Sequence, residues 1–193
     1  MNHGDHVSLL RGAVEAGGVW ADFGSGAGAF TLALADLIGP SGRIYSVERD
    51  GRALREQQSA MRGRFPDVRV EYVAADFTRK VDLPPLDGIV MANSLHFIRD
   101  KAPVLALMRG YLKPDGRFVL VEYNADHGNT WVPYPLSYPT WERMARENGF
   151  RVTRKLAAVP SRFLGEIYSA VSSVVNEVPS VESRVQGEQR AEK

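Results

Sequence analysis

The sequence predicts an α/β fold in which helices cover both faces of a seven-stranded, mostly parallel sheet with an antiparallel C-terminal strand. Apolar runs of strand length alternate with segments of helical periodicity along most of the chain. A glycine-rich turn follows the first apolar run, where doubly wound domains pass from strand to helix. A short loop joins the last two apolar runs, and a loop of that length permits only antiparallel pairing. Together these observations favour a single doubly wound sheet.

Composition supports one globular domain. The chain has 193 residues, of which 44% are hydrophobic and 24% charged, so it is long enough to bury a sizeable core. The 24 basic and 23 acidic residues leave a formal net charge of +1, and no global field attracts a polyanion. Nucleic-acid binding is therefore disfavoured.

Cysteine usage and the N-terminal residues bear on location. The chain has no cysteine, which excludes disulfides, thiolate metal sites and a cysteine nucleophile and fits a cytoplasmic location. The opening residues, MNHGDHVSLL, lack a basic region followed by an apolar run, so we expect no signal peptide. No apolar stretch approaches the ~18 residues that a membrane-spanning helix needs.

The first third of the chain is expected to form helix, strand and helix. Residues 7–16 have a helical pattern that the pair Gly17-Gly18 interrupts, and residues 19–23 form a buried strand. The glycine turn then leads into a helix over 29–38, which "GPSG" (39–42) ends, because proline cannot continue a helix and glycine suits its C-terminal cap.

The middle of the chain continues the alternation. A strand over 43–48 precedes a polar, arginine-rich helix over 50–65, with Leu54, Gln58 and Met61 at helical spacing. The remaining elements of this part are expected at 68–75 (strand), 87–95 (strand), 99–112 (helix), 113–116 (turn) and 117–123 (strand). Between residues 77 and 86 there is little room for a helix, and "DLPPL" predicts a loop there.

The last part contains a proline- and aromatic-rich loop (124–139), a helix over 140–149 capped by Gly149, and strands at 151–159 and 166–175. The final residues are charged and nearly free of large apolar groups. We therefore expect a domain over 1–176 and a disordered charged tail over 177–193.

The stretch "VWADFGSGAGAF" (19–30) indicates a ligand site. It lies where a buried strand ends and a helix begins, and the unpaired N–H groups and dipole of a helix N-terminus attract electron-rich ligands. Three alternating glycines, Gly24, Gly26 and Gly28, let the backbone approach a ligand closely. One or two glycines would indicate only helix-on-strand packing, whereas three in this place favour a ligand turn.

Two ligands fit this turn. "GSGAGA" followed about twenty residues later by Glu48 matches a dinucleotide fingerprint. However, Asp22 precedes the first glycine, and a carboxylate there suits an amine or a cation better than a pyrophosphate. Asp76 ends another strand beside the same crevice, and the antiparallel end of the sheet also departs from the dinucleotide pattern.

Five segments in order resemble the class I S-adenosylmethionine-dependent methyltransferases, and the resemblance covers roughly residues 7–175. "ADFGSGAG" is similar to their first motif, "YSVERD" to the acidic end of their second strand, and "AADF" to the segment that binds adenine. "DGIVMANSLHF" and "LKPDGRFVLVEY" resemble their fourth and fifth strands. The resemblance implies a Rossmann-like fold, with S-adenosylmethionine as cofactor and S-adenosylhomocysteine as product.

The resemblance also implies roles for individual residues. The cofactor-binding residues it marks are Asp22, Gly24, Ser25, Gly26, Gly28, Glu48, Arg49, Asp76, Phe77 and Asn93. Glu48 would take the ribose, Asp76 and Phe77 the adenine edge, and Asn93 would offer its carbonyl to the amino group. Structural alternatives stay open: Glu48 as a solvated strand end, Asp76 as a turn cap and Arg49 as a surface residue.

Catalytic residues are less clearly marked. The weak candidates are His96, just beyond the fourth strand, and Tyr123, at the end of the fifth. A neutral imidazole accepts protons near neutral pH, although His96 equally suits packing between strand and helix. The loop over 124–139 either covers a flat or apolar acceptor or packs its aromatics on the helix behind it. We expect no metal site, because His3, His6 and Asp5 have no supporting cluster.

Three functions follow for testing. The first is transfer of a methyl group from S-adenosylmethionine to a small-molecule acceptor. The second is an NAD(P)-dependent oxidoreductase with a Rossmann fold, and the third is a non-catalytic S-adenosylmethionine-binding module.

Overall fold

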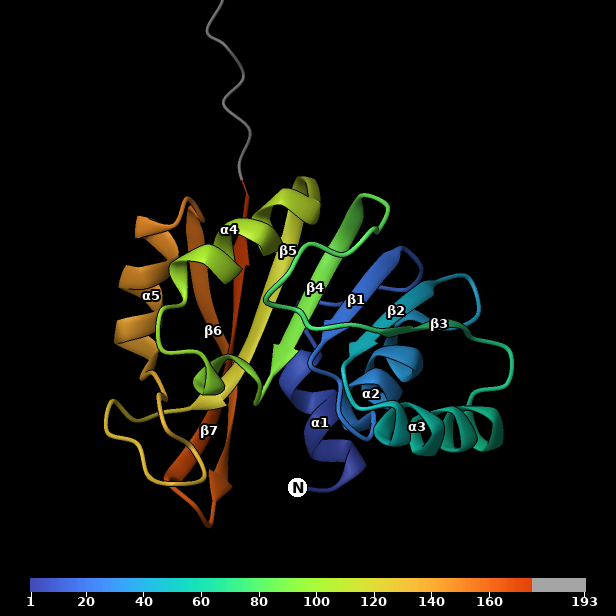
Figure 1. Ribbon diagram of the computed structural model, residues 1–193, viewed down its shortest axis with the longest axis horizontal. Coiled ribbons are helices and arrows are strands. Elements are labelled where there is room, and N and C mark those ends of the chain that lie inside the picture. Colours follow the sequence, from blue (N-terminus) through green and yellow to red (C-terminus); the bar gives the residue numbers. More distant parts are fainter. Residues whose placement is uncertain (175–193) are drawn as a thin grey trace, which may run out of the picture.

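The computed structural model describes residues 1–174, and these residues fold around a seven-stranded sheet with the strand order β3-β2-β1-β4-β5-β7-β6 (Figure 1). The strands are β1 (Val19–Phe23), β2 (Arg43–Glu48), β3 (Arg69–Ala74), β4 (Leu86–Ala92), β5 (Leu112–Tyr123), β6 (Val152–Ser161) and β7 (Gly165–Ser173). The helices are α1 (His3–Leu10), α2 (Ala29–Ile38), α3 (Gly51–Arg64), the 3-10 helix η1 (Leu95–Phe97), α4 (Ala102–Tyr111) and α5 (Tyr138–Glu147).

The strand directions confirm the predicted sheet. Strands β1 to β5 pair in parallel, whereas β7 lies antiparallel between β5 and β6. Strand order reverses between β1 and β4, and in open α/β sheets the crevice outside the carboxyl ends of the strands at such a point is where ligands bind. The carboxyl ends of β1 to β4 are therefore the part of the fold that positions a site.

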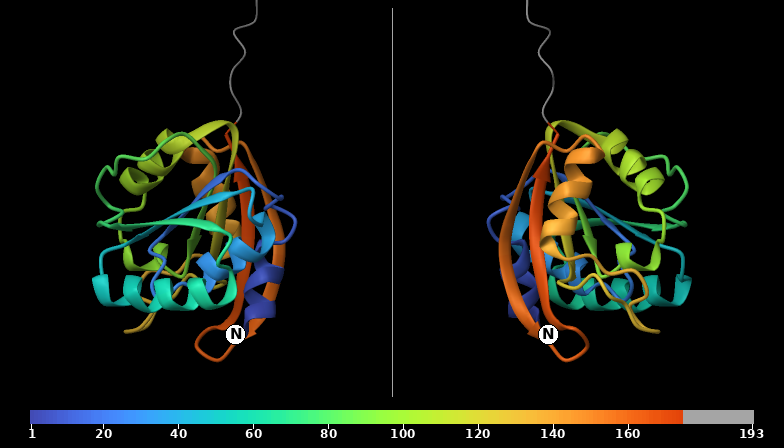
Figure 2. Two further views of the ribbon diagram at one scale, coloured as in Figure 1. Left: turned by 90° about the vertical axis from the view of Figure 1, so that its right-hand side faces the viewer. Right: turned by 90° about the vertical axis from the view of Figure 1, so that its left-hand side faces the viewer.

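Each face of the sheet carries its own hydrophobic core. One core joins the sheet to α1 and α2 and includes Trp20 and Leu34. The other joins it to α4 and α5 and is centred on Phe118 and Trp141, both fully buried. Figure 2 shows the sheet between these layers, with α1 and α4 on opposite sides.

An extended segment over residues 75–85 takes the place of a helix after β3, as the sequence predicts, and Figure 1 shows it crossing in front of the sheet. Val81 anchors it, because its side chain joins the α4–α5 core and its backbone N–H donates to the Tyr111 hydroxyl at 2.7 Å. The chain thus covers β1 and β2 on this face without a helical crossover.

The first helix differs from its predicted bounds of 7–16. It begins at His3 because Asn2 and Asp5 form a capping box in which each side chain accepts the other's backbone N–H. It ends at Leu10, shortly before Gly12 takes a φ of +93°. The glycine pair at 17–18 therefore lies well beyond the end of the helix.

The ends of β4 and β5 also differ from prediction. β4 stops at Ala92 rather than at residue 95, because Asn93 adopts a left-handed φ of 51° and η1 follows. The predicted turn at 113–116 lies inside β5, where the register with β4 jumps from Leu86–Leu112 to Gly88–Arg117. Four residues of β5, 113–116, therefore lie opposite the single Asp87 of β4, and Asp115 among them has a left-handed φ of 63°.

Residues 175–193 lie outside the described part of the chain, and so do the predicted tail over 177–193 and the domain end at 176. Among the described residues, no helix has the length and apolar character needed to cross a bilayer.

Gly88 offers a test of the sheet core. A Cβ at this position would overlap the ring of Trp20, which pairs with Gly88 across β1 and β4 and is 3% exposed. We expect Gly88→Ala to lower the free energy of unfolding by about 1–3 kcal/mol, because the buried ring must shift. Urea denaturation measures this loss. In a Trp20→Leu background the same change should cost clearly less, and equal losses in both backgrounds would contradict the overlap.

Candidate active site

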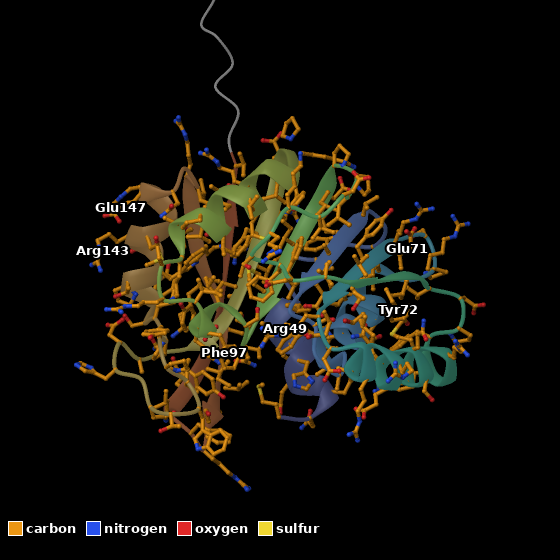
Figure 3. All side chains as sticks on the ribbon, in the orientation of Figure 1. Arg49, Glu71, Tyr72, Phe97, Arg143 and Glu147 are labelled. Carbon is orange, nitrogen blue, oxygen red and sulfur yellow. The ribbon has the colours of Figure 1, made fainter. Side chains whose placement is uncertain are left out.

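A cavity of about 340 Å³ opens where β1 to β4 end, and we call it the strand-end cavity. This volume lies within the range of small-molecule sites. The lining residues come from the segments after those four strands: Gly24, Gly26, Glu48, Arg49, Ala75, Asp76, Phe77, Thr78, Asn93, Ser94, Phe97 and Ile98. Figure 3 shows Arg49 and Phe97 near each other at this edge of the sheet.

Two glycines of the turn after β1 line the cavity for different reasons. Gly24 has a φ of +73°, and a Cβ there would lie 2.6 Å from the Cβ of Ser94, so the turn and the β4 end meet only through glycine. Gly26 has a φ of +53°, and a Cβ there would meet nothing within 4 Å. Packing therefore does not require glycine at 26, and the open space lies beside a backbone that a ligand can approach closely.

Glu48, at the end of β2, ties the glycine turn to the neighbouring strand. Its Oε2 accepts the backbone N–H of Gly26 at 3.0 Å, and its Oε1 accepts that of Asp50 at 2.9 Å. A carboxylate offers about four acceptor positions, so two remain for donors in the cavity. A pair of adjacent hydroxyls, as on a ribose, fits these positions.

Asp76, after β3, lines the same cavity. Its Oδ1 accepts both the backbone N–H of Thr78 at 2.9 Å and the Thr78 hydroxyl at 2.8 Å. These hydrogen bonds lower the pKa of Asp76, and Arg49 and Arg79 add a smaller effect, so the group is anionic at neutral pH. Its Oδ2 has no hydrogen bond within residues 1–174 and can accept an amine. Asp76 is thus a turn cap with one oxygen free.

Asn93 supplies an acceptor without a partner. Its left-handed backbone is held by the N–H donating to the Val121 carbonyl at 2.9 Å. Its Oδ1 is buried and lacks a hydrogen bond within the described chain, although the residue lines the cavity. An unpaired buried oxygen costs about 1–3 kcal/mol, so a donor from a ligand would relieve this cost.

Three of the sequence-predicted residues do not line the cavity. Asp22 lies 1% exposed at the end of β1 and accepts the Thr31 hydroxyl at 2.7 Å. Burial raises the pKa of Asp22 to about 7, with the Thr31 hydrogen bond opposing this shift. The carboxyl group therefore lies within the fold beneath the turn rather than at its mouth.

Ser25 and Gly28 instead hold the turn against α3. Ser25 Oγ lies 2.7 Å from Ser46 Oγ, and Gln57 Nε2 donates to Ser25 Oγ and to the Gly26 carbonyl, both at 3.1 Å. A Cβ at Gly28 would overlap the Gln57 side chain. Gln57 is fully buried, so the inward face of α3 carries Gln57 rather than the predicted Gln58.

His96 and Tyr123, the catalytic candidates, lie beside the cavity rather than on its wall. His96 is 3% exposed, and its Nδ1 lies 2.9 Å from a carboxylate oxygen of Glu122, which is fully buried on β5. The rings of His96 and Tyr123 meet edge to face at 5.7 Å. Burial, with Glu122 adding to it, raises the pKa of the Tyr123 hydroxyl.

Backbone and side-chain hydrogen bonds connect the loop over 124–139 to the segment around His96. The Tyr134 N–H donates to the His96 carbonyl at 3.0 Å, and Lys101 Nζ donates to the carbonyls of Ile98 at 2.7 Å and Tyr134 at 3.0 Å. Burial lowers the pKa of Lys101. Within this loop Trp131 and Tyr134 are exposed, whereas Leu136 is buried in the α4–α5 core.

Sequence reasoning missed several lining residues, namely Ala75, Thr78, Ser94, Phe97 and Ile98. Each of these residues follows the end of β3 or β4 by a few positions. Their place directly after a predicted strand was the sequence feature that could have marked them as lining residues. Glu122 was missed as a partner of His96 because 26 residues separate the two in sequence.

The donor and acceptor pattern of the strand-end cavity fits an adenosyl cofactor. The carboxylates of Glu48 and Asp76 are hydrogen-bond acceptors at the ends of two neighbouring strands. Asn93 Oδ1 is a further acceptor without a partner among the described residues, and Phe77 lines the cavity with an aromatic ring. These acceptors suit hydroxyl and amine groups and would repel a pyrophosphate.

A family model described as a methyltransferase domain matches residues 15–157 of this chain. A similar protein is the ubiquinone/menaquinone biosynthesis C-methyltransferase UbiE of Pseudomonas savastanoi pv. phaseolicola, 27% identical over 131 residues. That match covers 64% of this chain and 51% of the relative, so the chain spans about half the length of such relatives.

Solved structures share the fold. The 1,6-didemethyltoxoflavin-N1-methyltransferase of Burkholderia thailandensis, solved with 1,6-didemethyltoxoflavin and S-adenosylhomocysteine, has a TM-score of 0.71 and 18% identity over 90% of this chain and 78% of that chain. The YcgJ protein of Bacillus subtilis has a TM-score of 0.70 and 14% identity over 91% of this chain and 100% of that chain.

Asp22 gives the site a pH-dependent stability. Its folded-state pKa of about 7 exceeds the ordinary 3.8, so the folded protein holds a proton that the unfolded chain releases, and stability falls as pH rises from 5 to 8. The Asp22→Asn variant lacks this ionisation. We expect the wild type to lose about 2–3 kcal/mol more than the variant over this interval. Urea denaturation of both proteins at pH 5 and pH 8 measures the difference, and parallel pH curves would contradict a buried, proton-binding Asp22.

Proposed function

The chain belongs to the methyltransferase-domain family, and from this premise we propose that it transfers a methyl group from S-adenosylmethionine to a small-molecule acceptor. The observation that carries the proposal is that Glu48 and Asp76, from the ends of neighbouring strands, line one cavity beside the open backbone of Gly26. Acids on adjacent strand tips are suited to the ribose and the adenine amine of one nucleoside.

The residues of the cavity bind and orient. When bound, S-adenosylmethionine supplies an activated methyl group on a sulfonium, so alignment and exclusion of water are the main tasks left to the protein. Glu48 would fix the ribose, and Asp76 with Phe77 would hold the adenine. The Asn93 side-chain oxygen would accept a donor of the methionine part. Ser94 keeps the β4 end in place, because its hydroxyl donates to the Phe23 carbonyl at 3.0 Å.

A small molecule is the favoured acceptor. The net charge of +1 creates no overall electrostatic attraction for a nucleic acid, and the cavity is lined in part by apolar side chains such as Phe97 and Ile98. Two similar proteins bear names of small-molecule methylation, one in ubiquinone and menaquinone biosynthesis and one on a toxoflavin precursor. The absence of cysteine fits a cytoplasmic setting.

The alternatives have weaker support. The antiparallel position of β7 and the acids around the cavity disfavour an NAD(P)-dependent oxidoreductase. A non-catalytic S-adenosylmethionine-binding module would show tight binding without a methylated product from any acceptor.

Calorimetric titration with S-adenosylhomocysteine tests the proposal. We expect wild-type protein to bind it and Glu48→Gln to weaken binding about 10–100-fold, because a charge-assisted hydrogen bond contributes about 1.5–3 kcal/mol. Absence of binding by the folded wild type would reject the proposal.

Glu71→Gln is the matched control. Glu71 lies on β3 at the outer edge of the sheet, where its carboxylate is 3.5 Å from Arg43 and half-exposed, and Figure 3 shows it away from Arg49. The same substitution there should leave the affinity unchanged. If both variants weakened binding equally, Glu48 would have no specific role.

A further inference from the structure

The pair of His96 and Glu122 lies buried beside the strand-end cavity, and the cofactor does not require it. The Glu122 carboxylate is fully buried, and its Oε1 and Oε2 lie 3.1 Å and 2.9 Å from His96 Nδ1. The same oxygens accept the backbone N–H groups of His96 at 3.0 Å and of Tyr123 at 3.2 Å. Glu122 thus fixes both the backbone and the ring of His96.

These contacts select one tautomer of the imidazole. Because Glu122 already accepts two backbone N–H groups, it acts as an acceptor toward Nδ1, and Nδ1 therefore carries the proton. In neutral His96 the free electron pair is then on Nε2, which points away from Glu122. Within residues 1–174, Nε2 has no hydrogen-bond partner.

Other polar groups around the pair leave this arrangement intact. Lys101 Nζ is occupied by two backbone carbonyls, although its charge acts on Glu122. The Tyr168 hydroxyl, opposite Glu122 on β7, is buried and has no hydrogen-bond partner among the described residues, and burial raises its pKa, with Glu122 adding to the effect. Tyr123 completes the set through its ring contact with His96.

Phe97 connects the pair to the cavity. Its ring lies 4.2 Å from the His96 ring between centroids, it lines the cavity, and 59% of the residue is exposed. A large exposed aromatic residue at a cavity wall suits stacking with a flat ring. Phe97 packs directly on the His96 ring, and an exposed side chain changes rotamer on the picosecond-to-nanosecond timescale.

We propose that Glu122 is a positioning residue that holds His96 ready to accept a proton, and that the acceptor molecule is a planar ring bearing an ionisable O–H or N–H group stacked on Phe97. This rests on the proposed function and names its substrate class. In the step, the bond from carbon to the acceptor O or N forms as the methyl carbon–sulfur bond breaks. The acceptor's proton passes to Nε2, leaving the imidazolium beside the Glu122 carboxylate and a neutral thioether product.

The test begins with methyl-transfer assays on a panel of planar phenols and planar N–H heterocycles, with products identified by mass spectrometry. An accepted phenol is then compared with its 2,4-dinitro derivative, called the nitro derivative here, whose hydroxyl is ionised at neutral pH. We expect His96→Gln to lower kcat on the parent phenol by about 100-fold or more at pH 7, because general-base catalysis contributes about that much. On the nitro derivative the loss should be at most a few-fold, since no proton remains to be removed.

Two further variants complete the design. Glu122→Gln should lower kcat on the parent phenol, with S-adenosylhomocysteine affinity retained, and spare the nitro derivative in the same way. His127→Gln, in the exposed part of the 124–139 loop, is the matched control and should change neither rate.

The outcomes separate the two proposals. Equal losses on both phenols for His96→Gln would mean that His96 is only structural and would overturn the inference. Binding of S-adenosylhomocysteine without methylation of any panel member would overturn the substrate class, while the cofactor site would stand. Failure of the folded wild type to bind S-adenosylhomocysteine would reject the proposed function itself.

Discussion

The contact on which the candidate site depends is the hydrogen bond from the Gly26 N–H to the Glu48 carboxylate. It joins the turn after β1 to the end of β2, alongside the backbone hydrogen bonds from the Gly24 and Ser25 N–H groups to the Val47 carbonyl at 2.8 Å and 3.2 Å. The second oxygen of Glu48 binds the N–H of Asp50, which itself caps α3. One side chain therefore sets the turn, the strand tip and the start of a helix in fixed relation, and the strand-end cavity takes its shape from that relation.

Two buried acids near the cavity are accommodated by different physical means. Asp22 has a single side-chain donor, Thr31, and its burial raises the pKa to about 7, so the protein lowers the cost by binding a proton. Glu122 instead receives the backbone N–H groups of His96 and Tyr123 together with the imidazole. Because donors surround its carboxylate, Glu122 can orient the imidazole of His96. Asp22, which binds a proton instead, contributes to the stability of the fold.

Local sequence signals predicted much of the fold because they act over short distances. The bounds of β1, α2 and β2 match the prediction, since an apolar run, a glycine turn and the "GPSG" stop each mark one boundary. The bounds of the first helix were predicted too late in the chain. The apolar pattern favoured a start at residue 7, whereas the capping box of Asn2 and Asp5 starts the helix at His3. The sequence marked residues 113–116 as a turn, but it could not show that Leu112 already pairs with β4 before them, because that pairing depends on the register between the two strands.

The candidate site was predictable only as far as strand order allows. Glu48, Asp76 and Asn93 follow strands whose carboxyl ends meet, so the sequence could place them together. Which way a side chain points is decided by packing. Ser25 hydrogen-bonds to Gln57, Gly28 packs against the Gln57 side chain, and Asp22 is buried beneath the turn. Each of these three lies within one or two residues of a lining position, so distance along the sequence does not tell which side chain faces the cavity.

The fold also explains why the proposed base and the acids proposed to bind the cofactor come from different parts of the sheet. The acids stand on β2 and the segment after β3, on one side of β1, whereas His96 and Glu122 belong to the segment after β4 and to β5, on the other side. The glycine turn after β1 lies between them, at the point where strand order reverses. A methyl group held over that turn would have the nucleoside-binding acids on one side and the proton acceptor on the other, so cofactor binding and acceptor choice can change independently.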